Sequence, residues 1–560
     1  MRKRNSGEEG SILIAVMIIM ILLAAGLATH LSSLVNVERL QNQRVANDRA
    51  IMAAEAGLAQ AIAQLQGMGS LPTANQTWTM NVPAAQFAPF QAVVVNVYPR
   101  PIGGHPTSWT LASTATSASD ARTRPFSRRV QTTLFQENFA KYEYFVNDFG
   151  GVWTPGYFHF EGFGSVFLGP YHTNSGVGFW PNLWFVNDAT TAAPKGVRYF
   201  SDYNTYQGIY GKSDASDYAN IMQYYSSTFD NAPQFYHGLN VLSDPISMPA
   251  DMTSTAEPRT AELRDNAGLE LPRDYKGYDA TKGANFAIEM DAAGGKSNDG
   301  KVYVKQYLGL KSDGKPYYGP KRTYKVKDIN SAMIVYGNIK SLQGTLDGKL
   351  TIGAFRKQPD AKDPDPSDPG GAVDITGSLN YASRPDDLSY TDAPGLYTAD
   401  GKGINQDYVA TLLDQMDKVT DILGIVSEGD VMIKEKDLDG QLVAADVNNP
   451  IHLDAIVMAT GSATSATTDG GYGVENFKTR AKGAALAIGG EIQNYGYSWA
   501  LYSGNNMTNG LVKTRLWDQR AYKPGGAPPF FPTTGNLQPI PQSWRSNYVT
   551  NAAVIPWFPQ

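Results

Sequence analysis

An unbroken apolar run near the N-terminus sets the strongest limit on how this chain can fold. Residues 12–28 are all apolar or Gly, and residues 10–37 contain no Asp, Glu, Lys or Arg. A helix of about 20 such residues is long enough to cross a bilayer. Because basic residues at positions 2–4 precede the run, the positive-inside rule predicts a single membrane pass with a cytoplasmic N-terminus.

The helical pattern continues beyond the apolar run, whereas a secretory signal normally ends in a cleavage site and a break in the helix. Apolar residues then recur at spacings of three and four and form one stripe: Ile51, Ala54, Leu58, Ile62 and Leu65. We therefore predict one helix of about 55 residues that ends at residues 67–69. Its first half is apolar all round and its second half is amphipathic.

These features resemble the type IV pilins. The basic leader, the Gly-Ser junction and the tract "NDRAIMAAEAGLAQAIAQL" are similar to the N-terminal domain of PilX-type minor pilins. The resemblance implies that prepilin peptidase cuts after Gly10 and leaves Ser11 as the new terminus. It also implies an inner-membrane subunit that later joins other type IV pilins in an extracellular pilus.

One position departs from the pilin pattern. Major pilins carry Glu at the fifth mature position, where this chain has Ala15. A carboxylate in hydrocarbon is costly, and pilins tolerate it because it meets a neighbouring subunit's N-terminal amine. Its absence favours a subunit at or near the pilus tip. A plain signal anchor and a pseudopilin-like subunit of a secretion system are the alternatives.

The rest of the chain has strand chemistry, with period-two alternation and frequent Gly, Pro and Asn turns. Four segments after the helix (77–82, 90–99, 108–116 and 128–136) predict an antiparallel pilin sheet. The fold class is therefore α+β. The predicted divisions are a leader (1–10), a pilin helix (11–68), a pilin-like sheet (70–138), an aromatic-rich β region with insertions (139–330), a β-solenoid-like region (331–535) and an extended tail (536–560).

Short Gly-punctuated strands in the second half predict stacked coils, in which each turn covers the exposed face of the last. Segments such as "GNIKSLQGTLDGKLTIGA" and "HLDAIVMATGS" also resemble a β-rich module of large competence pilins, over most of residues 140–535. The irregular spacing leaves a β-solenoid and a sandwich both open. The dense aromatics at 142–185 favour packed ladders in a core over an exposed stacking platform.

Catalytic and cofactor motifs fail on inspection. The chain has no Cys, which excludes disulfides and Cys-ligated metals. Gly-Lys-Ser triplets at Gly211 and Gly295 lack the Gly five positions earlier that a phosphate loop needs. His172, in a Gly-Asn turn, is interpreted as structural. We predict no enzyme activity, cofactor or metal site.

Two groups of carboxylates keep alternatives open. Asp360, Asp363, Asp365 and Asp368 lie in a Pro-rich loop that reads better as a solvated linker than as a calcium site. Asp374, Asp430 and Asp454 would form a candidate catalytic site if they met in one groove, because glycoside cleavage uses paired carboxylates. That arrangement would make the protein an anchored enzyme acting on envelope polysaccharide.

The strongest candidate binding patch lies between residues 305 and 327, where six Lys and one Arg accompany a single Asp. Interleaved Tyr rings could stack on bases while the cations contact phosphates, so this composition favours sequence-independent DNA binding. A charged outer face on a twisted hairpin is the alternative. The candidate DNA-binding residues are Lys311, Lys315, Tyr317, Tyr318, Lys321, Arg322, Tyr324, Lys325 and Lys327. The overall charge of −6 requires that any such site be local.

Overall fold

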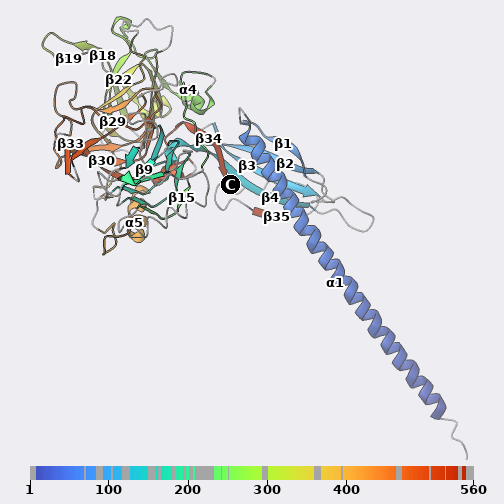
Figure 1. The fold of residues 1–560 in the computed structure, drawn as a ribbon. Coiled ribbons are helices and arrows are strands. Elements are labelled where there is room, and N and C mark those ends of the chain that lie inside the picture. The colour runs from blue at the N-terminus through green and yellow to red at the C-terminus, as the bar shows by residue number, and fades with distance from the viewer. Residues whose placement is uncertain are drawn as a thin grey trace, which may run out of the picture. The chain divides into compact units, whose positions relative to one another are not determined.

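A computed structural model gives the fold (Figure 1). It describes residues 8–68, 71–82, 92–102, 105–116, 127–148, 159–161, 165–175, 177–179, 183–192, 197–200, 206–207, 233–240, 243–249, 251–255, 257–292, 300–357, 367–386, 388–391, 395–444, 446–461, 469–503, 506–523, 525–539 and 545–549.

One helix, α1 (Glu8–Gln66), forms the N-terminal part of the chain, as predicted. Its second half packs on a sheet through small and apolar side chains that are fully buried: Ala50, Ala53, Ala54, Leu58, Ala61 and Leu65. The predicted stripe therefore faces the core, with Ile51 and Ile62 half-buried at its margins. The helix ends where Gly67 donates its N–H to the Ala63 carbonyl.

The sheet under α1 has the order β1-β2-β3-β4-β34, and its strands β1 to β4 pair antiparallel. Its first four strands lie close to the predicted segments: β1 (Gln76–Asn81), β2 (Ala92–Ile102), β3 (His105–Thr116) and β4 (Ser127–Asn138). Alternate residues such as Val93, Val95 and Leu111 point into the shared core and are completely buried. The α+β class is thereby confirmed.

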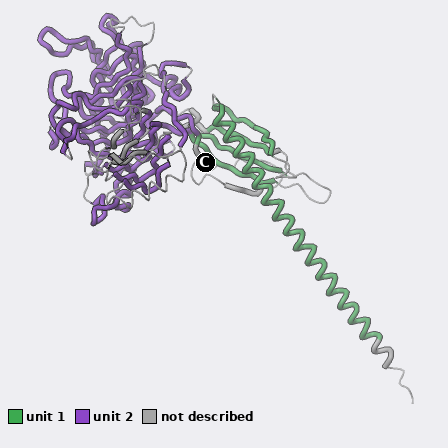
Figure 2. Tube along the Cα trace, in the orientation of Figure 1, with its two compact units in different colours: residues 1–135, 537–560 green, residues 136–536 purple. Residues whose placement is uncertain are grey.

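The chain divides into two compact units, coloured separately in Figure 2. Unit 1 comprises residues 1–135 and 537–560, and unit 2 comprises residues 136–536. Unit 2 is thus an insertion between β4 and β34 (Thr533–Pro539). Near and within the segment predicted as an extended tail (536–560), β34 and β35 (Arg545–Val549) both pair with β4. Backbone pairing over a long sequence separation left no local pattern to predict this.

Unit 2 is built mainly from two large sheets. In the first, the strand order is β15 (Leu239–Asn240), β11 (Ala189–Thr191), β8 (Tyr171–Thr173), β5 (Tyr144–Asp148), β31 (Glu491–Tyr495), β28 (Ile456–Ala459), β25 (Ile422–Ser427), β23 (Lys349–Phe355), β21 (Ala332–Tyr336) and β16 (Leu269–Leu271). In the second it is β19 (Pro316–Tyr318), β18 (Lys301–Leu310), β17 (Asn285–Asp291), β22 (Asn338–Leu346), β24 (Val373–Tyr381), β27 (Ile451–Asp454), β30 (Gly483–Ile488), β33 (Asn506–Leu516) and β32 (Ala500–Ser503), with β20 (Arg322–Lys325), β26 (Val431–Ile433) and β29 (Tyr472–Val474) beside this path.

Shorter strands form two further sheets. One has the order β14 (Gln234–Phe235), β10 (Trp184–Phe185) and β7 (Val166–Phe167). The other has the order β13 (Tyr206–Gln207), β12 (Val197–Phe200), β9 (Val177–Phe179) and β6 (His159–Glu161).

From β21 to β33 the chain alternates between the two large sheets. Successive passes through the first sheet (β21, β23, β25, β28, β31) pair in parallel, and so do β22, β24, β27, β30 and β33 in the second. β5 continues the first sheet beyond β31, again in parallel. This parallel pairing differs from the antiparallel pairing typical of a sandwich.

Aromatic ladders fill the interior of the early strands, as the sequence predicts. Phe185 stacks between Phe167 and Phe235, with centroid distances of 4.9 and 4.8 Å. Tyr144 stacks on Tyr171, its partner across strands β5 and β8, with a centroid distance of 5.5 Å. Phe167, Phe185 and Tyr171 are almost fully buried, so these rings form core and offer no exposed platform.

Among the described residues of unit 2, two short helices accompany the strands. One is α4 (Ala261–Asn266), which is preceded by a 3₁₀ turn. A second helix, α5 (Gln406–Met416), was not predicted. Its signals were an Asn405 cap, which accepts the Tyr408 N–H, and buried residues at helical spacing, Val409, Leu412 and Met416.

Candidate membrane helix and nucleic-acid interface

The first half of α1 extends away from its sheet with its apolar side chains exposed (Figure 1). Every residue from 13 to 45 is exposed, a stretch of 33 residues or about 50 Å of helix. Among the described residues, one helix is long and apolar enough to cross a membrane, and this helix is α1. A continuous apolar surface of this kind, with exposed fractions of 60% at Leu23 and 62% at Ile21, is typical of a segment that lies in a membrane or against a partner.

The predicted leader junction lies within this helix. Gly10 and Ser11 belong to α1, which begins two residues earlier at Glu8. Cleavage between them remains a prediction.

The predicted DNA-binding residues lie on a hairpin at one edge of the second large sheet. β18 pairs antiparallel with β17, β19 and β20. Its alternate residues Val302, Val304 and Gln306 are fully buried. The side chains of the intervening residues therefore share the opposite, outer face.

Four Lys side chains gather on this outer face. Lys301 lies directly opposite Lys325 in the β18–β20 register. Continuing the same register places Lys321, just before β20, opposite Lys305. The two pairs are four residues apart along β18, about 14 Å at the usual rise. We call these four residues the lysine face.

The aromatic rings beside the lysine face are covered by it. The Lys321 ammonium lies 3.4 Å from the Tyr303 ring centroid, and the Lys305 ammonium lies 4.4 Å from that of Tyr318. Burial, followed by the charges of Asp439 and neighbouring groups, raises the pKa of Tyr318 to about 12. These rings hold the cations in place and do not present a free stacking surface.

Of the nine predicted residues, Tyr318 lies beneath Lys305 as described above, and the other eight separate into three groups. Lys321 and Lys325 are on the lysine face, whereas Lys311, Lys315 and Tyr317 are exposed around the β18–β19 turn, and Lys327 is exposed on the following 3₁₀ turn. Arg322 and Tyr324 point the other way. The Arg322 guanidinium donates to the Lys276 carbonyl, and the Tyr324 hydroxyl donates to the Asp274 carbonyl at 3.3 Å.

Sequence reasoning missed Lys301 and Tyr303 and left Lys305 out of the candidate set. Their signal was the alternation with buried Val302 and Val304, which assigns the odd-numbered positions to one face. Acidic groups border the same face, because Asp291 and Glu289 lie opposite Lys301 and Tyr303 on β17. The face is therefore less positive than the Lys count suggests.

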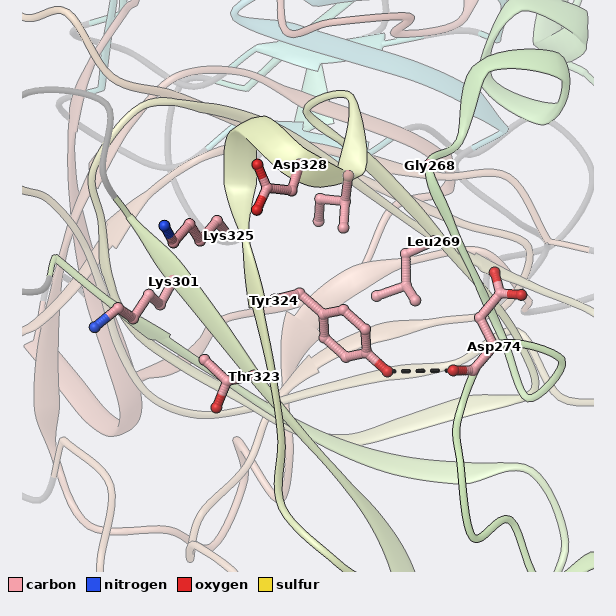
Figure 3. Close-up of a pocket in the computed structure, with 9 residues that line it drawn as sticks. Gly268, Leu269, Asp274, Lys301, Thr323, Tyr324, Lys325 and Asp328 are labelled. Carbon is pink, nitrogen blue, oxygen red and sulfur yellow. Dashed lines mark hydrogen bonds between the residues drawn. The ribbon is translucent and has the colours of Figure 1, made fainter.

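A depression adjoins the Lys301–Lys325 pair (Figure 3). It has a volume of about 400 Å³ and is lined by residues of β16, β18, β20 and the 3₁₀ turn after β20. Figure 3 shows the Lys301 and Lys325 ammonium groups on one side and Leu269 and Asp274 on the other, with the Tyr324 ring between. Asp328, Thr323 and the buried Ile329 complete the wall.

The other chemical candidates are engaged in structure. His172 bonds Thr190 and Asn174 through its two ring nitrogens, and burial lowers its pKa to about 4, which confirms its structural interpretation. No group of His, Asp and Glu suited to a metal occurs among the described residues. Asp360, Asp363 and Asp365, like Gly211 and Gly295, lie outside the described residues. Asp368 accepts hydrogen bonds from Asn338 and the Gly370 N–H.

The three carboxylates of the enzyme alternative have separate partners. Asp374 faces Lys434 at 3.8 Å, and Asp454 accepts the Tyr381 N–H and pairs with Arg384. Asp430 accepts the N–H groups of Gly470 and Gly471 and the hydroxyl of Tyr497. Each carboxylate thus satisfies local donors, which is a structural role.

Comparison with known proteins adds little. No family model matches the chain, and no curated protein matches it. Among solved structures, it is similar to the crystal structure of the competence-associated pilin ComZ from Thermus thermophilus. The match has 14% identity, covers 90% of this chain and 98% of that one, and has a TM-score of 0.27. A score this low does not establish a shared fold.

Proposed function

We propose that this protein is a minor type IV pilin, anchored in the inner membrane by α1 and later incorporated into a pilus. The observation that carries the proposal is the division of α1 at residue 45. The first part of α1 is apolar and exposed. It continues without a break into a second part that is buried on an antiparallel sheet. A cleavable signal would not need such continuity, whereas a subunit that moves from bilayer to filament core does.

The finer features follow from the sequence. Prepilin peptidase would cut between Gly10 and Ser11, the N-terminus would be cytoplasmic, and other type IV pilins would be the partners. Ala15 favours a place at or near the pilus tip, where no further subunit requires a carboxylate. The exposed β-rich module, which we interpret as a β-solenoid, would act by binding and not by catalysis.

Cysteine labelling tests the membrane anchor, because the natural chain has no Cys. Leu23→Cys and Val45→Cys place thiols at positions 60% and 50% exposed in the protein itself. In intact membranes, we expect a membrane-impermeant maleimide to label the Val45→Cys variant, and the Leu23→Cys variant only after detergent is added. Equal labelling of both before detergent would contradict the anchor.

Two alternatives predict other phenotypes. If the protein is a pseudopilin-like subunit of a secretion system, deletion of its gene would abolish protein export and leave DNA uptake and twitching unchanged. An anchored polysaccharide-acting enzyme would show glycan turnover by the isolated protein.

The lysine face favours DNA binding as the role of the module. Two like-charged pairs directly opposite on neighbouring strands destabilise a sheet, so their presence is explained by an anionic partner that contacts them together. Lys groups at about 14 Å spacing can contact separate phosphates of one backbone. Because Tyr303 and Tyr318 are covered, the contacts would be to phosphate and not to bases.

A salt series tests DNA binding. If each of the four Lys contacts one phosphate, the logarithm of the DNA association constant should fall with the logarithm of the salt concentration at a slope of about −4. The double variant Lys305→Gln/Lys321→Gln should make this slope shallower by about 2. The matched control is Lys402→Gln/Lys418→Gln, which removes two exposed charges on either side of α5. Equal slopes for both double variants, or no binding at low salt, would exclude the lysine face and leave adhesion as the role.

A further inference from the structure

Three side chains meet where the chain enters and leaves unit 2, and they carry an inference independent of pilus incorporation and of DNA. Unit 2 runs from residue 136 to residue 536. Glu137 and Lys141 lie close to its first residue, and Asn536 is its last. We propose that Lys141 and Asn536 become joined by an isopeptide bond, with Glu137 as the group that transfers the proton.

Glu137 contacts both reacting groups. Its side chain is 2% exposed. Oε1 of its carboxylate accepts a hydrogen bond from the Lys141 ammonium group, and Oε2 accepts one from the Asn536 side-chain amide at 3.4 Å. The Thr534 hydroxyl donates to the same Oε2 at 2.8 Å and so fixes the orientation of the carboxylate. One buried carboxylate therefore holds a primary amine and a carboxamide at its two oxygens.

The backbone brings these residues together across most of the chain. Glu137 lies near the end of β4, and Lys141 is the last residue of the 3₁₀ turn that follows. Phe139, in that turn, donates its N–H to the Pro532 carbonyl, which holds the start of β34 beside the turn. Asn536 lies on β34, in the same short stretch of backbone.

The surroundings of the amine favour its neutral form over an ion pair. The Lys141 side chain is 15% exposed and its nitrogen lies 4.6 Å from the centroid of the Tyr142 ring. Tyr142 and Phe139 are 4% and 0% exposed. Burial makes an ion pair costly, because two neutral groups need less solvation than two charges. Transfer of a proton from the amine to Glu137 removes this cost and leaves the amine nucleophilic.

The reaction balances without an added reagent. Glu137 takes a proton from the Lys141 ammonium group, and the neutral Nζ attacks Cγ of Asn536. The bond from Cγ to the side-chain amide nitrogen breaks as that nitrogen takes the proton from Glu137 and leaves as ammonia. The ammonia carries away the surplus proton of Nζ as ammonium, and Glu137 is regenerated as the carboxylate. Asn536 is exposed, so the leaving group has a path to solvent.

The bond would join the two ends of unit 2 by a covalent link. The chain has no Cys, so a disulfide cannot do this. A link that closes a segment of about 400 residues restricts the unfolded chain and thereby stabilises the folded one. Tension applied to the two ends of unit 2 would then be carried by an amide bond and not by the hydrogen bonds of its sheets.

Denaturing mass spectrometry of the purified full chain tests the bond. We expect a mass lower by one ammonia than that of the unlinked chain, and peptides joined through Lys141 and Asn536 after protease digestion. Lys141→Arg keeps the charge beside Glu137, and Asn536→Ser changes an exposed residue, so both variants should fold. Each should have the unlinked mass.

Two further variants separate the role of Glu137 from a general effect of substitution. Glu137→Gln removes the proton-transfer group and should slow formation of the bond by tenfold or more. Lys523→Arg, in an exposed ion pair with Asp417, is the matched control and should keep the lower mass.

Three outcomes would overturn the proposal. The first is a natural protein that keeps the unlinked mass after prolonged incubation in the folded state. The second is a lower mass that persists in Lys141→Arg or Asn536→Ser. The third is the loss of water in place of ammonia, with Lys141 joined to Glu137. None of these outcomes affects the membrane labelling or the DNA salt slope, because both depend on other residues.

Discussion

Buried charge at Glu143 shows how single residues set the stability of unit 2. Glu143 precedes β5, and its backbone carbonyl accepts the Glu491 N–H at the point where β5 meets β31. Its carboxylate is 3% exposed and accepts the Gly169 N–H at 2.6 Å. Burial raises its pKa to about 7, although the Arg515 charge opposes the shift.

This shift predicts a pH dependence of stability. A carboxyl whose pKa is raised by folding binds more protons in the native state, so the free energy of unfolding falls as pH rises from about 4.5 to about 7. At 1.36 kcal/mol per pKa unit the loss is at most about 3 kcal/mol. Glu143→Gln should therefore raise the melting temperature at pH 8 and leave it nearly unchanged at pH 4.5.

Melting curves of the natural protein and Glu143→Gln between pH 4.5 and 8 provide the measurement. A variant that melts lower than the natural protein at pH 8 would show that the Arg515–Glu143 attraction exceeds the cost of burial. Glu270→Gln is the control for a general effect of removing a negative charge, because Glu270 is only half-buried and pairs with Arg273.

At the level of elements, Gly57 explains why the "AAEAGL" tract suits the helix–sheet contact in unit 1. A Cβ on Gly57 would lie 2.8 Å from Val93 Cγ1 and 2.9 Å from Val93 Cβ. Val has a stiff χ1 and cannot turn away. The small residues of α1 therefore let the helix lie close to β2.

We expect Gly57→Ala to destabilise unit 1 although Ala gains about 1 kcal/mol of helix propensity, because overpacking costs about 1–3 kcal/mol. Thermal unfolding in detergent checks this, and Val93→Ala should restore the stability of Gly57→Ala. Gly26→Ala is the matched control, since nothing lies within 4 Å of its added Cβ. Similar melting temperatures for both single variants would show that α1 is not closely packed on β2.

Periodicity made most elements predictable. The apolar stripe of α1 and the alternation in β1 to β4 are local signals, and both were read correctly. The α5 helix was missed because its short pattern lies among Gly and Asp turns. On β18, alternation was present, yet counting charges without assigning faces put Arg322 and Tyr324 in the binding set and left Lys301 out.

At the scale of the whole chain, topology escaped prediction. Nothing local indicates that β34 and β35 return to β4 after about 400 residues, or that β5 stacks on β31. Both depend on backbone hydrogen bonds between distant segments, and such bonds leave no periodic trace in the sequence. The parallel stacking of β21 to β31 was foreseeable because each turn repeats a short strand and a Gly.

The most direct test is mass spectrometry of the N-terminus of this protein in filaments sheared from the cell surface. If the protein is a pilin anchored through α1, it should be present in the sheared fraction and should begin at Ser11. Its absence from filaments that contain the other pilins, together with an envelope form that begins at Met1, would contradict the assignment and favour a permanent signal anchor.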